Sequence, residues 1–316
     1  MANRPIIEHV IDAICAASVS APIVVGESEA LMAVRECVGD GVDGVGRPAY
    51  VTCEENPDMA ATLRAVAPLV GDSPCLLQPA DGLLGEPVAS LVGSLSHGSP
   101  DLVLHVRDLT ETVFGDEHHG TGVSVPGRSE PEVAVFGPGV LRRATDALRA
   151  REPGDLALVA ERLAAAGGSV RFQLTEGWRR YDGDGADLLE LNRIALDGLV
   201  PDVRPSLRRE NRIEGRVLIH PSASARDSVI VGPTVIGPGA RIENAYLGAY
   251  TSVGAGAHIA GAEIERSIIS PGASVVHVGG RLVSSLVGRD ARVFRDFSLP
   301  RAMRLWVGDG GEVALC

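Results

Sequence analysis

The residues best suited to chemistry lie in one short stretch that begins at Trp178 and reads WRRYDGD. A tryptophan ring stacks well on a sugar or a base, although packing inside the protein is an equally good use for it. The adjacent Arg179 and Arg180 carry the planar, forked donors that hold a phosphate. Asp182 and Asp184 are spaced as in a calcium loop, but the bidentate glutamate and the remaining ligands of such a loop are absent. The stretch therefore indicates contact with a phosphate-bearing ligand rather than a calcium site.

The basic residues are all arginine, because the sequence has 29 Lys+Arg positions and none of them is lysine. A Schiff base or a compact ammonium charge therefore has no side chain to supply it. The net charge of −12 also argues against nucleic acid as a partner, since a phosphate backbone requires a basic face.

Cysteine usage and hydropathy predict a cytoplasmic protein. The five cysteines are odd in number and widely spaced, with no CxxC, which favours reduced thiols over a disulfide framework or a zinc site. No apolar stretch approaches the roughly 18 residues that a membrane helix needs. Glu8 and Asp12 lie inside the apolar pattern of the N-terminal segment, which is not typical of a signal peptide. We therefore expect no membrane as a partner.

Two kinds of element must position the candidate residues, and the clearer kind is a repeat in the last hundred positions. Ile219, Ile236, Val253, Ser270 and Val287 stand seventeen apart. Each is followed by Gly or Pro in most units, and an alanine comes at about the fifth place. Apolar residues five to six apart within a fixed period predict a β-solenoid whose coils each contain three short strands.

The preceding part of the chain alternates strand and helix patterns. This alternation predicts an α/β domain with a mostly parallel sheet. We expect residues 1–202 to form that domain, 203–215 to be a linker, and 216–316 to be the solenoid with a C-terminal cap. Strands are expected at 22–27, 47–55, 73–84, 101–106, 132–138 and 169–174, and helices at 5–17, 59–69, 140–150, 155–166 and 186–198.

This arrangement resembles the sugar-1-phosphate nucleotidyltransferases, and most of all the long, actinobacterial-type glucose-1-phosphate thymidylyltransferases. The motifs that carry the resemblance are ANRPIIEHVIDAI, LLQPADGLL, AVFGPGVL, EGW followed by DLLELNRIALD, IGPGARIENAYLGAYTSVGAGAHIAGAEIERSII and LPRAMRLWVGD. The resemblance implies a nucleotidyltransferase-like (Rossmann-like) α/β domain followed by a left-handed β-helix, which is a hexapeptide-type solenoid. It also implies joining of a nucleoside triphosphate to a sugar 1-phosphate, with release of pyrophosphate and Mg²⁺ held by carboxylates.

The resemblance assigns candidate roles residue by residue. Asp81 matches the first metal-binding aspartate of the family. Tyr181 falls on the second one, so that Asp182, one place later, is the carboxylate left to serve. Arg180 and Arg4 replace lysines of the family. The implied substrate-binding residues are thus Arg4, Trp178 and Arg180, and the implied Mg²⁺ ligands are Asp81 and Asp182.

Several family elements are missing from the chain as written. The Gly-rich phosphate loop would precede Met1, and the EKP element has no counterpart in TGVSVPGRSEPEVAVF. In the family, small residues at the positions of Asp58 and Met59 admit the nucleotide base. Carboxylates are expected at the positions of Ala157 and Ala160. Loss of a single electrostatic donor typically costs ~10²–10³ in rate. The losses therefore predict a catalytically degenerate member of the family.

Three functions follow from these observations as alternatives. The first is a degenerate member that binds a nucleotide or nucleotide-sugar, or that assembles as a homo-oligomer or with an active paralogue. The second is an active nucleotidyltransferase that uses Mg²⁺ and arginines in place of lysines. The third is an oligomerisation scaffold that acts through its solenoid alone.

Overall fold

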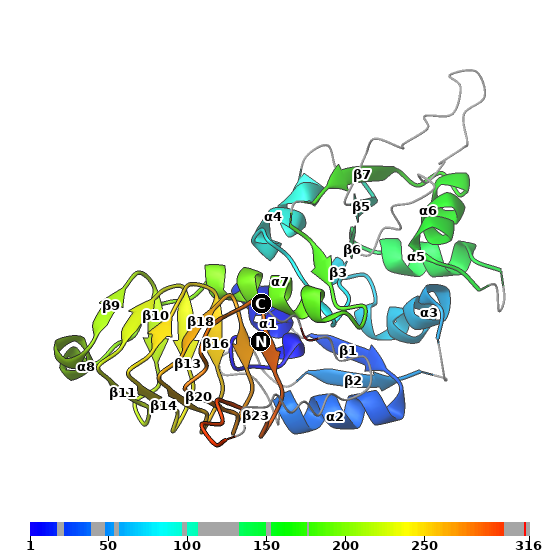
Figure 1. Cartoon of the computed structure of the whole chain (residues 1–316). Helices are drawn as coiled ribbons and strands as arrows, with labels where there is room; N and C mark the ends of the chain where they lie inside the picture. Colours follow the sequence, from blue (N-terminus) through cyan, green and yellow to red (C-terminus); the bar gives the residue numbers. More distant parts are fainter. Residues whose placement is uncertain are drawn as a thin grey trace. The chain divides into compact units, whose positions relative to one another are not determined.

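The computed structural model of the chain consists of two compact units, Met1–Leu199 and Val200–Cys316 (Figure 1). The structure describes residues 1–17, 22–38, 48–53, 57–96, 100–106, 133–149, 153–175, 177–299 and 313. Each unit is considered by itself below.

The first unit contains every strand and helix region that the sequence predicts. Two helices, α2 and α4, are additional. In chain order the elements are α1 (Ile6–Ala16), β1 (Ile23–Gly26), α2 (Ser28–Val38), β2 (Ala49–Thr52), α3 (Met59–Val70), β3 (Cys75–Leu77), β4 (Gly82–Leu83), α4 (Val88–Gly93), a 3₁₀ turn (Ser94–Ser96), β5 (Leu102–Val106), β6 (Val133–Phe136), α5 (Val140–Ala147), α6 (Leu156–Ala165), β7 (Val170–Leu174), β8 (Arg179–Arg180) and α7 (Gly185–Asp197). No described helix is long and apolar enough to span a bilayer.

The prediction of a mostly parallel sheet is confirmed with one exception: β3, β5 and β7 of the main sheet run in the same direction, and β6 runs against them. The main sheet has the order β3-β6-β5-β7, in which β5 pairs with β7 in parallel while β6 runs antiparallel to both β3 and β5. A separate parallel pair joins β1 to β2, and a short antiparallel pair joins β4 to β8. A parallel pair needs a long crossover, which α5 and α6 supply between β5 and β7. An apolar run in the sequence carries no sign of its direction, so the antiparallel strand was not predicted.

The main sheet is covered on its two faces by different side chains. On one face, Leu104 and Phe136 of the sheet pack against helices α3, α5 and α6. These helices contribute the buried side chains of Leu63, Leu141 and Leu163, in that order. On the other face, Val103, Val133 and Val135 pack with Leu91 of α4 and with Trp178. Strand alternation explains the division, because successive residues of a strand point to opposite faces.

The two strands that hold the candidate site are anchored by a smaller core. Leu83 of β4 packs with Val10 of α1 and with Leu191 and Ile194 of α7. The Asp184 side chain accepts a hydrogen bond from the backbone N–H of Ala186 at 3.0 Å and so caps the first turn of α7. This packing holds β4, and with it the adjacent Asp81, against helices α1 and α7.

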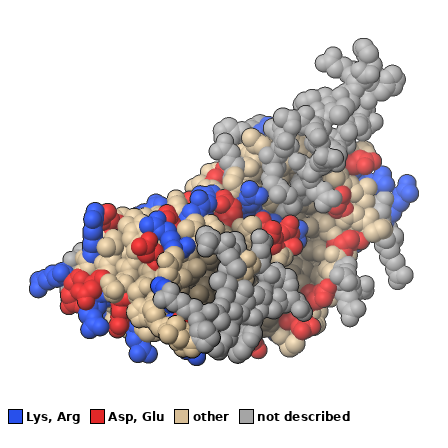
Figure 2. All heavy atoms as spheres, in the orientation of Figure 1, with Lys and Arg blue, Asp and Glu red and all other residues tan. Residues whose placement is uncertain are grey.

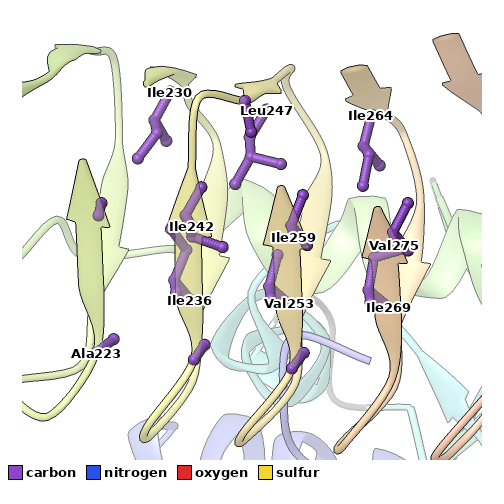
Figure 3. Close-up of a cluster of buried hydrophobic side chains, with 14 of the residues drawn as sticks. Ala223, Ile230, Ile236, Ile242, Leu247, Val253, Ile259, Ile264, Ile269 and Val275 are labelled. Atoms are coloured by element: carbon purple, nitrogen blue, oxygen red, sulfur yellow. The ribbon is translucent and has the colours of Figure 1, made fainter. Parts of the chain in front are cut away.

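The second unit is a solenoid of three parallel five-stranded sheets. The sheets have the orders β10-β13-β16-β19-β22, β11-β14-β17-β20-β23 and β21-β18-β15-β12-β9. Figure 3 shows the core as rows of apolar side chains, such as Ile242, Ile259 and Val275, stacked from coil to coil. The strands are β9 (Arg212–Glu214), β10 (Val217–Ile219), β11 (Ser224–Arg226), β12 (Val229–Val231), β13 (Thr234–Ile236), β14 (Arg241–Glu243), β15 (Tyr246–Leu247), β16 (Thr251–Val253), β17 (His258–Ala260), β18 (Glu263–Glu265), β19 (Ile268–Ile269), β20 (Ser274–Val276), β21 (Arg281–Val283), β22 (Leu286–Val287) and β23 (Arg292–Phe294).

The repeat is less regular than its sequence suggests, and one predicted core position is wrong. Ile219, Ile236 and Val253 pair in steps of 17 residues, but Val253 then pairs with Ile269, a step of 16, and Ile269 pairs with Val287, a step of 18. Ile269 is 1% exposed, so it and not Ser270 is the core residue. The coil that ends at Ile269 is therefore one residue shorter than the repeat. The shorter coil keeps an apolar side chain in the core row, because a serine in that row would leave its hydroxyl in an apolar core.

The segment predicted as a linker is part of the solenoid. It contains α8 (Pro205–Glu210) and β9, and β9 pairs in register with β12. Leu207 packs on the solenoid core. Asn211 is buried and donates to the carbonyl groups of Leu207 and Ala225 at 3.0 and 2.9 Å. Residues 203–215 therefore close one end of the solenoid. The cap predicted at the other end lies in 300–316, of which only residue 313 is described.

Charged side chains of both signs are intermixed on the described surface shown in Figure 2. On the solenoid, for example, Arg281 contacts Glu263 and Glu265 at 3.0 and 3.2 Å. This intermixing leaves no continuous basic stripe on the described part of that face.

Candidate functional site

Asp81 lies at the start of the short antiparallel pair formed by β4 and β8. Gly82 pairs with Arg180 and Leu83 with Arg179, and the N–H of Tyr181 donates to the carbonyl oxygen of Asp81 at 3.0 Å. The same register therefore places Tyr181 directly opposite Asp81, although the two come from positions 100 residues apart.

The Asp81 carboxylate is occupied by an arginine. Arg180 donates from Nε to both carboxylate oxygens of Asp81, at 3.0 Å to Oδ1 and 2.9 Å to Oδ2. The side chains are 48% and 41% exposed, so this is an accessible ion pair. The structure thus brings together two of the residues that the resemblance selected, but it joins them to each other.

Asp182 contacts a residue in the first turn of α7. Its backbone N–H donates to Oδ2 of Asp187 at 3.4 Å. A hydrogen bond between the two carboxyl groups lowers the pKa of Asp182 and raises the pKa of Asp187. Asp182 also lies beyond the end of β8, one position past Tyr181, and the structure does not bring it opposite Asp81.

Arg4 does not lie with the other candidate residues in any described contact. Its Nε donates to Oε2 of Glu8 at 2.7 Å, and one terminal nitrogen donates to Oδ2 of Asp12 at 2.6 Å. Both partners belong to α1 and follow Arg4 by one and two helical turns. The arginine that stands in place of a family lysine therefore forms a local ion-pair cluster.

Trp178, which the resemblance assigned to substrate binding, packs in the core of the first unit. The side chain is 5% exposed and lies in the core with Leu91, Val103, Val133 and Val135. Its ring also lies so close to Gly82 that a Cβ at position 82 would overlap it. This burial favours the packing alternative, and a substrate-binding role for Trp178 stays a prediction.

The close contact between Trp178 and Gly82 gives a direct prediction. Gly82→Ala should lower the free energy of unfolding by ~1–3 kcal/mol, because the added methyl group forces the buried indole or the β4–β8 pair to shift. Urea denaturation followed by tryptophan fluorescence measures the change. Gly93→Ala is the matched control, because an added Cβ there meets nothing within 4 Å. Equal stability of the two variants would contradict the packing role.

Two residues that differ from the family pattern have structural roles in this chain. Asp58 caps α3 by accepting a hydrogen bond from the N–H of Ala61 at 2.7 Å. Ala160 is fully buried in the core between the helices and the sheet, where a carboxylate would be desolvated. In the segment that has no counterpart of the EKP element, 121–136, residues 121–132 lie outside the described residues and 133–136 form β6.

The donor set does not fit a Mg²⁺ ion. Magnesium prefers six oxygens in octahedral geometry, usually with one or two protein carboxylates and the substrate phosphates. Among the described residues no group of three His, Cys, Asp or Glu side chains converges on a point. Beside Asp81, the position of a second carboxylate is held by Tyr181, and the charge of Asp81 is balanced by Arg180.

Sequence reasoning missed one buried polar pair in this domain. His105, near the end of β5, is 3% exposed, and its Nδ1 lies 2.9 Å from Oγ1 of Thr175. Its Nε2 has no hydrogen-bond partner, and burial lowers the pKa of the imidazole to about 4. The histidine sits within the apolar run LVLHV, which the pattern identified only as a strand.

Comparison with known proteins extends over the whole chain. No protein-family model matches it. It is 28% identical over 332 residues to the glucose-1-phosphate thymidylyltransferase of Streptomyces antibioticus, with 100% of this chain and 92% of the relative covered. It is 28% identical over 331 residues to the low-salt glycan biosynthesis nucleotidyltransferase Agl11 of Haloferax volcanii, with the same coverage.

Further matches name the same enzyme. The glucose-1-phosphate thymidylyltransferase of Streptomyces griseus is 28% identical over 324 residues, with 98% of this chain and 90% of the relative covered. A solved Bacillus anthracis structure that carries the same enzyme name, in complex with sucrose, aligns at a TM-score of 0.48 and 12% identity, over 60% of this chain and 82% of that one. These sequence matches, at 28% identity over 98–100% of the chain, confirm the resemblance that the motifs indicated: the chain is similar to sugar-1-phosphate nucleotidyltransferases, among them glucose-1-phosphate thymidylyltransferases.

Proposed function

We propose that this chain is a non-catalytic member of its family, which binds a nucleotide or a nucleotide-sugar and acts by sensing that ligand or by assembly. Its relatives bear the names of enzymes that transfer a nucleotidyl group to a sugar phosphate. The assembly would be a homo-oligomer or a complex with an active paralogue. Mg²⁺ would take part only as a companion of the nucleotide.

One observation carries the proposal: Asp81, the best-matched catalytic position, is paired with Arg180 and faces Tyr181. Nucleotidyl transfer depends on a metal ion and on cationic groups that bear the charge developing on the triphosphate. With a single carboxylate at this point, that metal is held poorly unless substrate phosphates complete its octahedron. The Arg4 cluster and the burial of Trp178 support the same conclusion, since both side chains are committed to contacts within the chain.

The expected loss of rate is large. Each lost electrostatic group typically costs ~10²–10³ in rate, and several are changed together here. Losses within one catalytic unit do not add fully, yet even one or two steps of this size leave turnover near background. Binding is less sensitive, because arginines can still meet a phosphate.

Two measurements on the same preparation test the proposal. A thermal-shift screen against nucleoside triphosphates and nucleoside diphosphate sugars should show stabilisation by one ligand class, of ~2.7 kcal/mol at a ligand concentration of 100 times Kd. A pyrophosphate-release assay with thymidine triphosphate and glucose 1-phosphate should stay at background. Release that disappears in Asp81→Ala would establish the active enzyme instead. No shift with any ligand would remove the sensing role and leave assembly.

A further inference from the structure

We infer that Arg180 takes the place of a divalent cation beside Asp81, so that this site receives phosphate-bearing ligands without metal. The part that concerns ligands rests on the proposed function. The part that concerns metal stands on the geometry of β4 and β8 alone.

The first step is the register of the two strands. Directly opposite residues of an antiparallel pair have Cβ atoms ~4.5–5.5 Å apart, a separation from which two carboxylates can share one cation. The residue opposite Asp81 is Tyr181, whose N–H is bonded to the Asp81 carbonyl at 3.0 Å. A phenol in that place supplies no anionic ligand, and Asp182 lies one position further on, past the end of β8 and not opposite Asp81.

The second step is charge. A metal ion beside Asp81 would have to displace a guanidinium whose Nε donates to both carboxylate oxygens. An exposed pair of this kind weakens metal binding by only about five-fold. The decisive factor is therefore the missing second carboxylate, and the ion pair adds to it.

The third step is what the arrangement offers in exchange. Arg180 is held by Asp81 and is about half exposed, so it presents a fixed positive charge at the surface where a metal-bound phosphate would otherwise sit. A guanidinium is a permanent cation and a forked donor that suits phosphate. Because the chain has no lysine, arginine is also the only type of side chain here that carries a permanent positive charge. The ligand class that fits is a phosphate monoester or a nucleotide in its metal-free form.

Metal binding is tested with Mn²⁺ alone, by electron paramagnetic resonance on the full chain. The wild type should show no stoichiometric site below ~1 mM. Arg180→Gln combined with Tyr181→Asp restores the second carboxylate and should bind Mn²⁺ at least ten-fold more tightly, and adding Asp81→Asn should abolish this gain. Arg142→Gln, which breaks the exposed pair with Asp72, is the matched control and should behave as wild type.

Two results would overturn the metal inference. One is a stoichiometric Mn²⁺ site in the wild type that Asp81→Asn removes; this comparison does not depend on whether the double variant folds. The other is a folded double variant that binds no Mn²⁺, because Arg180 and Tyr181 would then not be what excludes the ion.

Ligand binding is tested separately, by calorimetry with glucose 1-phosphate and with thymidine triphosphate. Affinity in EDTA should equal affinity in Mg²⁺ within two-fold, and Arg180→Gln should weaken it by about ten-fold or more, as expected for a lost charge-assisted hydrogen bond. Binding that requires Mg²⁺ would overturn the inference. Absence of binding under both conditions would count against the ligand-binding part of the proposed function and leave assembly, while the Mn²⁺ experiment would still decide the metal inference.

Discussion

Acidification from pH 7 to pH 4 should lower the free energy of unfolding by about 3 kcal/mol through His105 alone. Burial lowers the pKa of this imidazole from 6.5 to about 4 in the folded protein. Each unit of pKa shift corresponds to about 1.4 kcal/mol, so a shift of roughly 2.5 units gives this magnitude.

The sign follows from which state binds the proton. The unfolded chain takes up a proton near pH 6.5, while the folded chain resists it until about pH 4. Stability is therefore fully present above pH 6.5 and is lost as the pH falls toward 4. The geometry supports the same sign of the effect. His105 is 3% exposed, and among the described residues Nε2 has no acceptor for the N–H that protonation would add.

Urea denaturation at pH 7, 5.5 and 4 measures the effect. His105→Gln should flatten the pH dependence of stability in this window, because the variant has nothing to protonate at that site. His220→Gln is the control, since His220 lies exposed beside Ser222 in the solenoid and should leave the slope unchanged. Parallel curves for the wild type and His105→Gln would contradict the burial argument.

The contrast between the two units explains how far the sequence could predict the fold. In the solenoid, each coil repeats the last, so the apolar spacing alone gave the three-strand coil and most core rows. The single error, Ser270 for Ile269, arose because a fixed period cannot register a coil of 16 residues followed by one of 18. In the first unit the apolar runs located the strands, but pairing between distant strands set their directions.

The candidate site shows the same limit at the level of single residues. The motif around Asp81 could be recognised locally, and Arg180 and Tyr181 could be aligned by counting. That Arg180 contacts Asp81 depends on a ladder between residues about 100 positions apart, which no local pattern reveals. The burial of Trp178 likewise depends on α4 and on one face of the main sheet. His105 could not be identified from the sequence, because only the structure shows that its side chain is buried and that its Nε2 has no partner among the described residues.

Ile259→Ala should lower the stability of the solenoid by about 2–5 kcal/mol, because it empties the middle of a packed row. Ile259 is fully buried on β17, between Ile242 of the preceding coil and Val275 of the following one (Figure 3). A coil has no core of its own and is stabilised only by its neighbours, so both interfaces of the central coil weaken at once.

Val293→Ala in the terminal described coil is the matched control for Ile259→Ala. Val293 continues the same row, pairs with Val275 on one side, and is only partly buried. Its truncation should cost about 1 kcal/mol, since one interface and less buried surface are affected. Hydrogen exchange on the full chain resolves the solenoid amides from those of the first unit, so the two losses can be measured without assuming that the units unfold together. Ile259→Ala should raise exchange across several coils, and Val293→Ala only near the end. Equal effects would mean that the row does not transmit stability from coil to coil, and that another interaction holds the solenoid together.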